Sequence, residues 1–180
     1  MQAQRERLLR AVAAAAVEGE PNVSRVAALA RAGRASFYEF FDDFEHALAT
    51  VRATAITSLE RALNGALERE RAPYAALRAL AAELLATIRA SPEASLCALA
   101  PGAGNASALG ACFARALEGW LSASSGAGFI TPRSDERRLL LATGAAEAFA
   151  RRTALTQLSR GSTDTDDGRV LADALMRLLR

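Results

Sequence analysis

The sequence predicts an all-α fold of about nine helices, and three observations carry this prediction. Of the 180 residues, 51% are hydrophobic, and alanine, the strongest helix former, is the commonest residue. The five prolines stand where helices can begin or end rather than inside apolar repeats. No β-branched stretch alternates with polar residues over a useful length, so a sheet has no candidate strands. The chain is long enough for a sizeable core and for one or two small domains.

A first helix is expected over residues 4–17, because Leu8, Leu9 and Val12 recur at helical spacing. Gly19 is expected to end this helix, since glycine tolerates the backbone conformations found at helix termini. The alanine-rich end of this helix is too short to cross a bilayer.

Two short helices separated by a tight turn are expected next, over residues 24–41. Ser24 is expected to cap the first of them, and Gly33 to supply a residue that tolerates positive φ in the turn. After the turn, Phe37 and Phe41 fall one helical turn apart and are expected to face inward. The side chains left more exposed by this arrangement are Arg34, Ser36, Tyr38 and Glu39. This order of elements is that of a helix-turn-helix.

The remainder of the chain predicts further helices separated by proline- and glycine-containing segments. Asp42 or Asp43 is expected to cap a long helix that reaches Arg71, and Pro73 fits the first turn of the next helix. From there, helices are expected over residues 73–91, 93–100, 107–122, 135–160 and 169–179, and connections over 101–105, 122–134 and 161–168.

Charge gives a local rather than a global indication of function. All 22 basic residues are arginine and the net charge is +2, which by itself does not predict nucleic-acid binding. A GC-rich coding bias is a sufficient explanation for the joint enrichment of alanine, arginine and glycine. Between Glu20 and Glu39, however, Arg25, Arg31 and Arg34 occur without an acidic residue. A basic patch therefore coincides with the expected helix-turn-helix.

These residues resemble the N-terminal DNA-binding domain of the TetR family of transcriptional regulators. The family's small-residue-plus-glycine turn is matched by Ala32-Gly33, and the hydroxyl-aromatic-Tyr-x-x-Phe run of its recognition helix by residues 36–41. Its acidic turn before a long helix is matched by Asp42-Asp43. The resemblance implies an N-terminal three-helix DNA-binding domain over residues 1–45 and a ligand-binding and dimerisation domain over residues 46–180. The residues that it implies at the DNA are Ser24, Arg25, Arg34, Ala35, Ser36, Tyr38 and Phe40.

The resemblance also implies partners and their sites. A repressor of this family binds double-stranded operator DNA as a homodimer and is released by a small molecule, here expected to be largely apolar. Residues assigned to the ligand pocket are Leu84, Ile88, Phe113, Leu117, Trp120 and Phe149. Residues assigned to the dimer interface are Leu140, Gly144, Ala148, Leu171, Leu175 and Leu178. The small side chains among them would independently allow close approach of two helices.

The sequence departs from the family pattern in two places. The turn after Gly33 is two or three residues shorter than usual, and Phe44 stands where the family commonly has a lysine near the DNA backbone. A shorter turn would rotate the recognition helix about its axis. An alternative function therefore remains open, namely a helical dimer that has lost operator binding and sequesters a ligand or binds another protein.

Other classes of function find little support in the sequence. His46 is the single histidine, and Cys97 and Cys112 lack the spacing of a metal or redox motif, so no metal or cofactor is expected. The sequence shows no nucleophile paired with a base, so the protein is not expected to be an enzyme. The two cysteines are expected to pack as small apolar residues, with a redox-sensing pair as the alternative. Without a signal peptide or a long apolar span, a cytoplasmic location without a membrane partner is expected.

Overall fold

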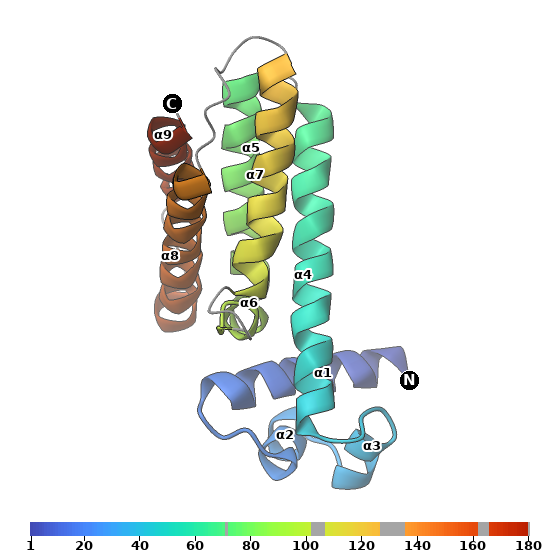
Figure 1. Ribbon diagram of the computed structural model, residues 1–180. Helices are drawn as coiled ribbons and strands as arrows, with labels where there is room; N and C mark the ends of the chain where they lie inside the picture. Colours follow the sequence, from blue (N-terminus) through green and yellow to red (C-terminus); the bar gives the residue numbers. More distant parts are fainter. Residues whose placement is uncertain (71, 102–106, 127–135, 162–165, 180) are drawn as a thin grey trace.

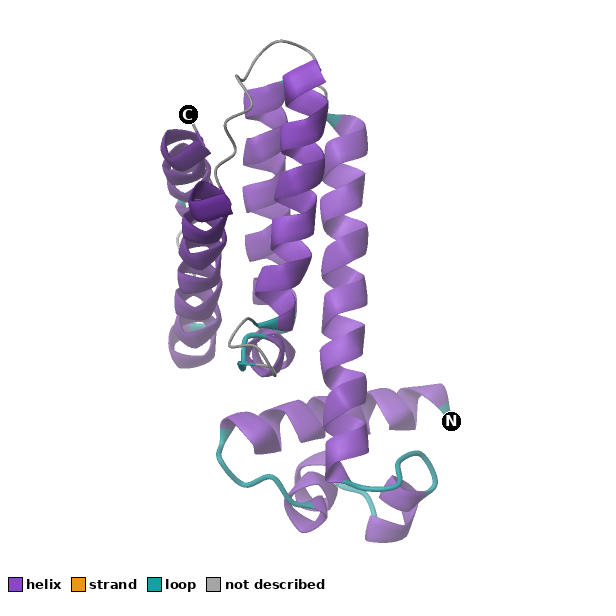
Figure 2. Ribbon diagram, viewed as in Figure 1, coloured by secondary structure: helices purple, strands orange, loops and turns teal. Residues whose placement is uncertain are grey.

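The computed structural model describes residues 1–70, 72–101, 107–126, 136–161 and 166–179. Within these residues it contains nine helices and no strand, which confirms the all-α prediction (Figure 2). The predicted connections over 101–105, 122–134 and 161–168 lie largely outside the described residues. No described helix is both long and apolar enough to cross a membrane.

Three helices form an N-terminal module beneath the rest of the molecule (Figure 1). They are α1 (Gln2–Val17), α2 (Val23–Ala30) and α3 (Arg34–Tyr38). Their apolar faces meet in one hydrophobic cluster that includes Leu8, Val12, Val26 and Phe37, each with no exposed surface. This N-terminal cluster also takes in Val51 of the following helix, so the module is closed by a segment that continues beyond it.

The helix α4 (Phe44–Arg69) belongs to both halves of the molecule. Its first two turns pack in the N-terminal cluster, whereas Leu59, Leu63 and Ala66 are buried in a second, larger cluster. Residues 52–58, between these two ends, include no buried side chain. Figure 1 shows α4 rising from the N-terminal module along the whole height of the bundle.

Five further helices complete the bundle around the larger cluster. They are α5 (Pro73–Ala90), α6 (Pro92–Ala98), α7 (Ala108–Gly126), α8 (Glu136–Arg160) and α9 (Asp167–Leu179). The central helix α5 buries Leu77, Leu80, Leu84 and Ile88, and α9 packs against it. Helices α8 and α9 lie side by side at one edge of the bundle (Figure 1).

Proline and aspartate set several helix starts as the sequence predicts. Pro73 occupies the first turn of α5, and the side chain of Asp43 accepts a hydrogen bond of 2.7 Å from the backbone N–H of His46. Gly19 has φ +80° just after α1. The predicted ends of α7 and the start of α9 are wrong by a few residues, because α7 continues to Gly126 and α9 begins at Asp167.

Candidate nucleic-acid interface

The start of α2 is fixed by Asn22 and not, as predicted, by Ser24. The Asn22 side chain accepts a hydrogen bond of 2.8 Å from the backbone N–H of Arg25, three residues later. Asn22 is extended, at φ −140°, which is the conformation of an N-cap residue. Ser24 is therefore already inside the helix, where its side chain is exposed.

The turn between α2 and α3 contains only residues 31–33, and its left-handed residue is Arg31 rather than the predicted Gly33. Arg31 ends α2 with φ 50° and ψ 47°, whereas Gly33 has φ −72° and ψ 153°. The backbone N–H of Arg31 bonds to the carbonyl of Ala28 at 3.2 Å, which satisfies one of the last carbonyls of α2. A left-handed conformation costs about 1–2 kcal/mol for a residue with a Cβ atom. The backbone strain of this motif therefore lies at an exposed arginine.

The five-residue helix α3 is anchored by aromatic side chains. Phe37 and Phe41 are buried, with ring centroids 5.4 Å apart, as the predicted inward spacing requires. Phe40 is half-buried against the same cluster. Phe44 is 8% exposed, so the position that departs from the family pattern is part of the core.

The anchoring leaves a polar and aromatic face of α3 in solvent. Tyr38 is 52% exposed, Arg34 and Ala35 are exposed, and Ser36 is half-buried. Arg34 and Arg31 form no ion pair with the residues that the structure describes. Arg31 is an exposed cation beside α3 that the sequence-based assignment left out, although its place in the basic patch was visible.

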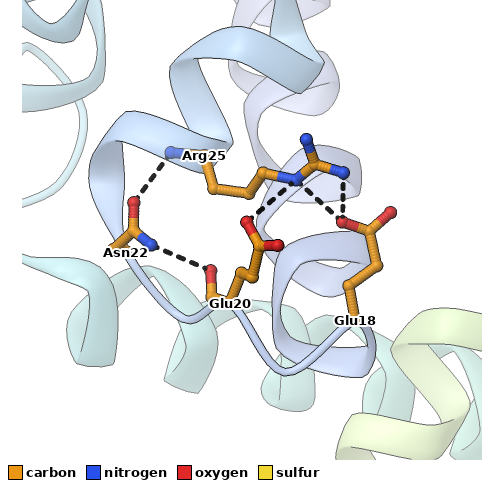
Figure 3. Close-up of polar contacts among 4 residues, drawn as sticks. All are labelled: Glu18, Glu20, Asn22 and Arg25. Atoms are coloured by element: carbon orange, nitrogen blue, oxygen red, sulfur yellow. Dashed lines mark hydrogen bonds and ion pairs between the residues drawn. The ribbon is translucent and has the colours of Figure 1, made fainter.

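Arg25 differs from these two arginines because acidic side chains hold its guanidinium group. Its Nη2 lies 2.7 Å from Glu18 Oε2, and its Nε lies 2.9 Å from the same oxygen and 3.5 Å from Glu20 Oε2. Figure 3 shows both carboxylates, from the segment after α1, facing the arginine on α2. The hydrogen bond to Glu18 is the main cause that raises the pKa of Arg25 above its ordinary value. The patch of three cations predicted from sequence is thus reduced to Arg31 and Arg34.

The residues assigned to a ligand pocket lie in the interior of the bundle. Leu84, Ile88, Phe113 and Leu117 have no exposed surface, and Phe149 is half-buried against the same cluster. Trp120 is 2% exposed, and its Nε1 donates a hydrogen bond of 2.9 Å to the carbonyl of Pro73. It also lines a cavity of about 340 Å³, which is formed by residues near the C-terminal end of α4, the start of α5 and the C-terminal part of α7.

The residues assigned to a dimer interface divide into two groups. Leu140 is 72% exposed, and Gly144 and Ala148 are also exposed on α8. Leu171 and Leu175 are instead fully buried within the protomer, so in this structure they offer no surface to a dimer partner, and Leu178 is half-buried. The stripe that α9 turns toward solvent contains Val170 in their place.

Comparison with known proteins supports the fold. The structure of a fatty acid degradation regulator, FadR from Bacillus halodurans, superposes with a TM-score of 0.69 at 12% identity, over 98% of this chain and 94% of that one. A protein of unknown function from Rhodococcus sp. RHA1 superposes with a TM-score of 0.67 at 22% identity, over 98% of this chain and 95% of that one. No protein-family model and no curated protein sequence matches the chain. At these identities the likeness shows that the chain has the all-helical fold of a regulator such as FadR.

Proposed function

We propose that the protein is a TetR-type transcriptional regulator that binds operator DNA as a homodimer and is released by a small molecule. The single observation that carries the proposal is the N-terminal module. In this module, at the N-terminal end of α4, a helix-turn-helix exposes Arg31, Arg34 and Tyr38. Cationic and hydroxyl side chains on a short exposed helix suit contacts to phosphates and base edges. The fold shared with FadR supports the same reading.

Dimerisation is supported by an apolar stripe on the outer edge of α8 and α9. Leu140, Leu141 and Leu155 are 72%, 55% and 52% exposed, and Val170 is 46% exposed. Apart from the backbone of α8 and the adjacent residues, no described atom lies within 4 Å of the place where a Cβ atom on Gly144 would stand, so a partner helix has room to approach. Scattered exposed leucines need no explanation, but these four side chains lie on two helices that pack against each other, and exposed apolar residues gathered on neighbouring helices are typical of an interface. A dimer would present two α3 helices to DNA sites about 34 Å apart.

Ligand release follows from the continuity of α4. Because α4 packs in both hydrophobic clusters, a displacement of its C-terminal half, which packs in the larger cluster, would move the module that carries α3. A ligand that favours the displaced state would lower the affinity for DNA by the same factor as DNA lowers the affinity for the ligand.

The alternative function, a dimer that no longer binds operators, is favoured by three observations. The helix α3 has only five residues, the turn before it only three, and Arg25 is neutralised by glutamates. Both functions predict a dimer, so only DNA binding separates them.

A fluorescence anisotropy titration with labelled duplexes tests the proposal. One duplex carries the DNA upstream of the protein's own coding region and the other a shuffled sequence of equal length and composition. We expect tighter binding to the upstream duplex, and log affinity that falls linearly with log salt for both. Equal, weak binding to both duplexes at low salt would overturn operator recognition and favour the sequestering dimer.

A further inference from the structure

A cleft of about 640 Å³ opens where the N-terminal module meets the bundle. Four helices form it: α1 from the module, α4 as the shared helix, and α5 and α6 from the bundle. Its volume falls within the usual range of small-molecule sites, about 300–1,000 Å³. None of the residues assigned from sequence to a ligand pocket lines it.

Small side chains on the walls create this space. Ala55 and Ser58 line it from α4, and Ala86 and Ala90 line it from α5. Leu9, Ala13 and Val51 supply an apolar base, of which Ala13 and Val51 are buried. The cleft thus offers an apolar floor that is open to solvent at its edge, which suits the flat or elongated body of an amphipathic molecule.

The charged groups of the cleft are two carboxylates and one guanidinium group. Glu6 and Arg10 stand one helical turn apart on α1, and Glu93 stands on the opposite side at the start of α6. Glu93 is half-buried, and it forms no ion pair with the residues that the structure describes. The formal charge of the cleft is therefore −1, and a ligand with a single positive charge would neutralise it. A half-buried carboxylate without a partner gains more from such a ligand than a solvated one does.

We propose that this cleft between α1, α4, α5 and α6 binds a small amphipathic organic cation, with its apolar body on Leu9, Val51 and Ala55 and its amine at Glu93. The proposal adds a ligand site outside the middle of the bundle. The proposal that the cleft binds this ligand does not depend on the proposed DNA-binding function.

The position of the cleft gives such a ligand a means of acting on the N-terminal module. The contact between the module and α6 is direct, since Cys97 on α6 belongs to the N-terminal cluster and its Sγ faces the carbonyl of Ala13 at 3.9 Å. Arg52 of α4 donates a hydrogen bond of 3.2 Å to the carbonyl of Cys97. A molecule lodged beside these contacts would change the angle between α1 and α6. This coupling, unlike the binding, rests on the proposed DNA-binding function.

Three naphthalene compounds of similar size and shape but different charge are compared: 2-(1-naphthyl)ethylamine, 2-(1-naphthyl)ethanol and the naphthalene-1-acetate anion. Binding of each to the full chain is measured by isothermal titration calorimetry, without DNA. We expect the amine to bind about tenfold more tightly than the alcohol and the anion to bind least, because a hydrogen bond between two charged groups is stronger than one to a neutral donor. Equal affinity for all three compounds, or no binding of the amine, would overturn the proposal.

Matched variants locate the binding site. Glu93→Gln is expected to bring the affinity for the amine down to that for the alcohol, whereas Glu118→Gln, an exposed glutamate on α7 outside the cleft, is expected to change neither. Ala90→Leu is expected to fill the cleft and weaken binding of the amine and alcohol together. Ala53→Leu, at an exposed position of α4 that does not line the cleft, is the control. Amine binding that survives both Glu93→Gln and Ala90→Leu would place the site elsewhere and overturn the proposal.

The coupling is tested in a separate titration. If operator DNA is bound, saturating amine is expected to change the affinity for the upstream duplex, and Ala90→Leu is expected to remove that change while leaving the affinity without amine intact. If the wild-type chain binds the amine but not the DNA, the proposed function is contradicted and the cleft assignment is unaffected. An unchanged DNA affinity in the presence of bound amine would refute the coupling alone.

Discussion

The arginines of the helix-turn-helix have different surroundings, although the sequence presents them as one basic patch. Arg25 is held by Glu18 and Glu20, whereas Arg31 and Arg34 are exposed and form no ion pair with the described part of the chain. The sequence could not predict this difference, because the pairing depends on how the segment after α1 folds back beside α2. The inward position of Phe37 was predictable, since it follows from helical spacing alone.

Replacement of Arg34 and Tyr38 is expected to affect DNA binding in different ways. Arg34→Ala removes a side chain suited to base edges, so it should cost about 1–3 kcal/mol on the upstream duplex and reduce the preference over the shuffled one. Tyr38→Phe removes a hydroxyl suited to a phosphate, so it should weaken both duplexes to a similar degree. Anisotropy titrations on the two duplexes measure both effects. Equal losses on both duplexes for Arg34→Ala would exclude it from base recognition.

Release of Arg25 is expected to strengthen DNA binding. The double variant Glu18→Gln/Glu20→Gln removes both carboxylates that hold the guanidinium group, which leaves this cation available for a phosphate. The slope of log affinity against log salt should then steepen by about 0.9 for one added phosphate contact. The triple variant that also carries Arg25→Ala is the control and should return to the wild-type slope. If the triple variant keeps the steeper slope, the gain comes from the lost negative charge and not from Arg25.

At the scale of single elements, the sequence predicted which helices exist more reliably than how they begin and end. Pro73 and Asp43 fix their helix starts locally, so their roles could be predicted. Asn22 and Ser24 are both residues that cap helices, and only the geometry shows that Asn22 bonds to the backbone of Arg25. The left-handed residue was assigned to Gly33 because glycine tolerates that conformation best, yet the last turn of α2 ends at Arg31.

The two candidate caps give a paired stability test. Asn22→Ala removes the hydrogen bond to the backbone of Arg25 and is expected to destabilise the N-terminal module by about 1 kcal/mol. Ser24→Ala changes an exposed side chain inside the helix and is expected to alter the free energy of unfolding by less than about 0.5 kcal/mol. Urea denaturation followed by circular dichroism measures both. A larger effect of Ser24→Ala than of Asn22→Ala would contradict the observed cap.

For the whole molecule, the sequence predicted the bundle but not which face of α8 points inward. From the sequence, Leu140 was assigned to a dimer interface, but the buried side chains of α8 were not predicted, and its buried stripe consists of Ala142, Ala146, Ala150, Thr153 and Ala154. Leu140 and Leu155 are exposed. Small residues bring α8 close to the bundle, and this leaves the larger side chains for another surface. Hydrophobicity alone cannot decide between two apolar faces of one helix. The division at residue 45 also remains a prediction, since α4 spans both clusters.

Gly144→Arg tests the proposed dimer. A Cβ atom at this position would meet no described atom within 4 Å apart from its own helix backbone and adjacent residues, so the variant should fold while a charged group blocks a partner helix. Sedimentation velocity is expected to show a monomer with unchanged helicity, and operator affinity is expected to fall because the two half-sites are no longer linked. Gly119→Arg on α7 is the matched control, because a Cβ atom there would likewise meet no other described residue beyond its own helix within 4 Å. A Gly144→Arg variant that remains dimeric would move the interface to another face.

The middle of α4 sets a limit to folding cooperativity. Residues 52–58 contribute no buried side chain, and Thr54 Oγ1 bonds back to the carbonyl of Thr50 at 2.8 Å, a pattern that weakens and bends helices. We therefore expect the N-terminal module to be a separate unit of local unfolding that opens while the bundle stays intact. Amide hydrogens of α2 and α3 should exchange with solvent through this partial opening at denaturant concentrations that leave those of α5 protected. The sole tryptophan, Trp120, lies in the bundle and would not detect the opening. Thermal unfolding followed by tryptophan fluorescence therefore reports unfolding of the bundle. It does not report unfolding of the N-terminal module, which is the part proposed to bind DNA.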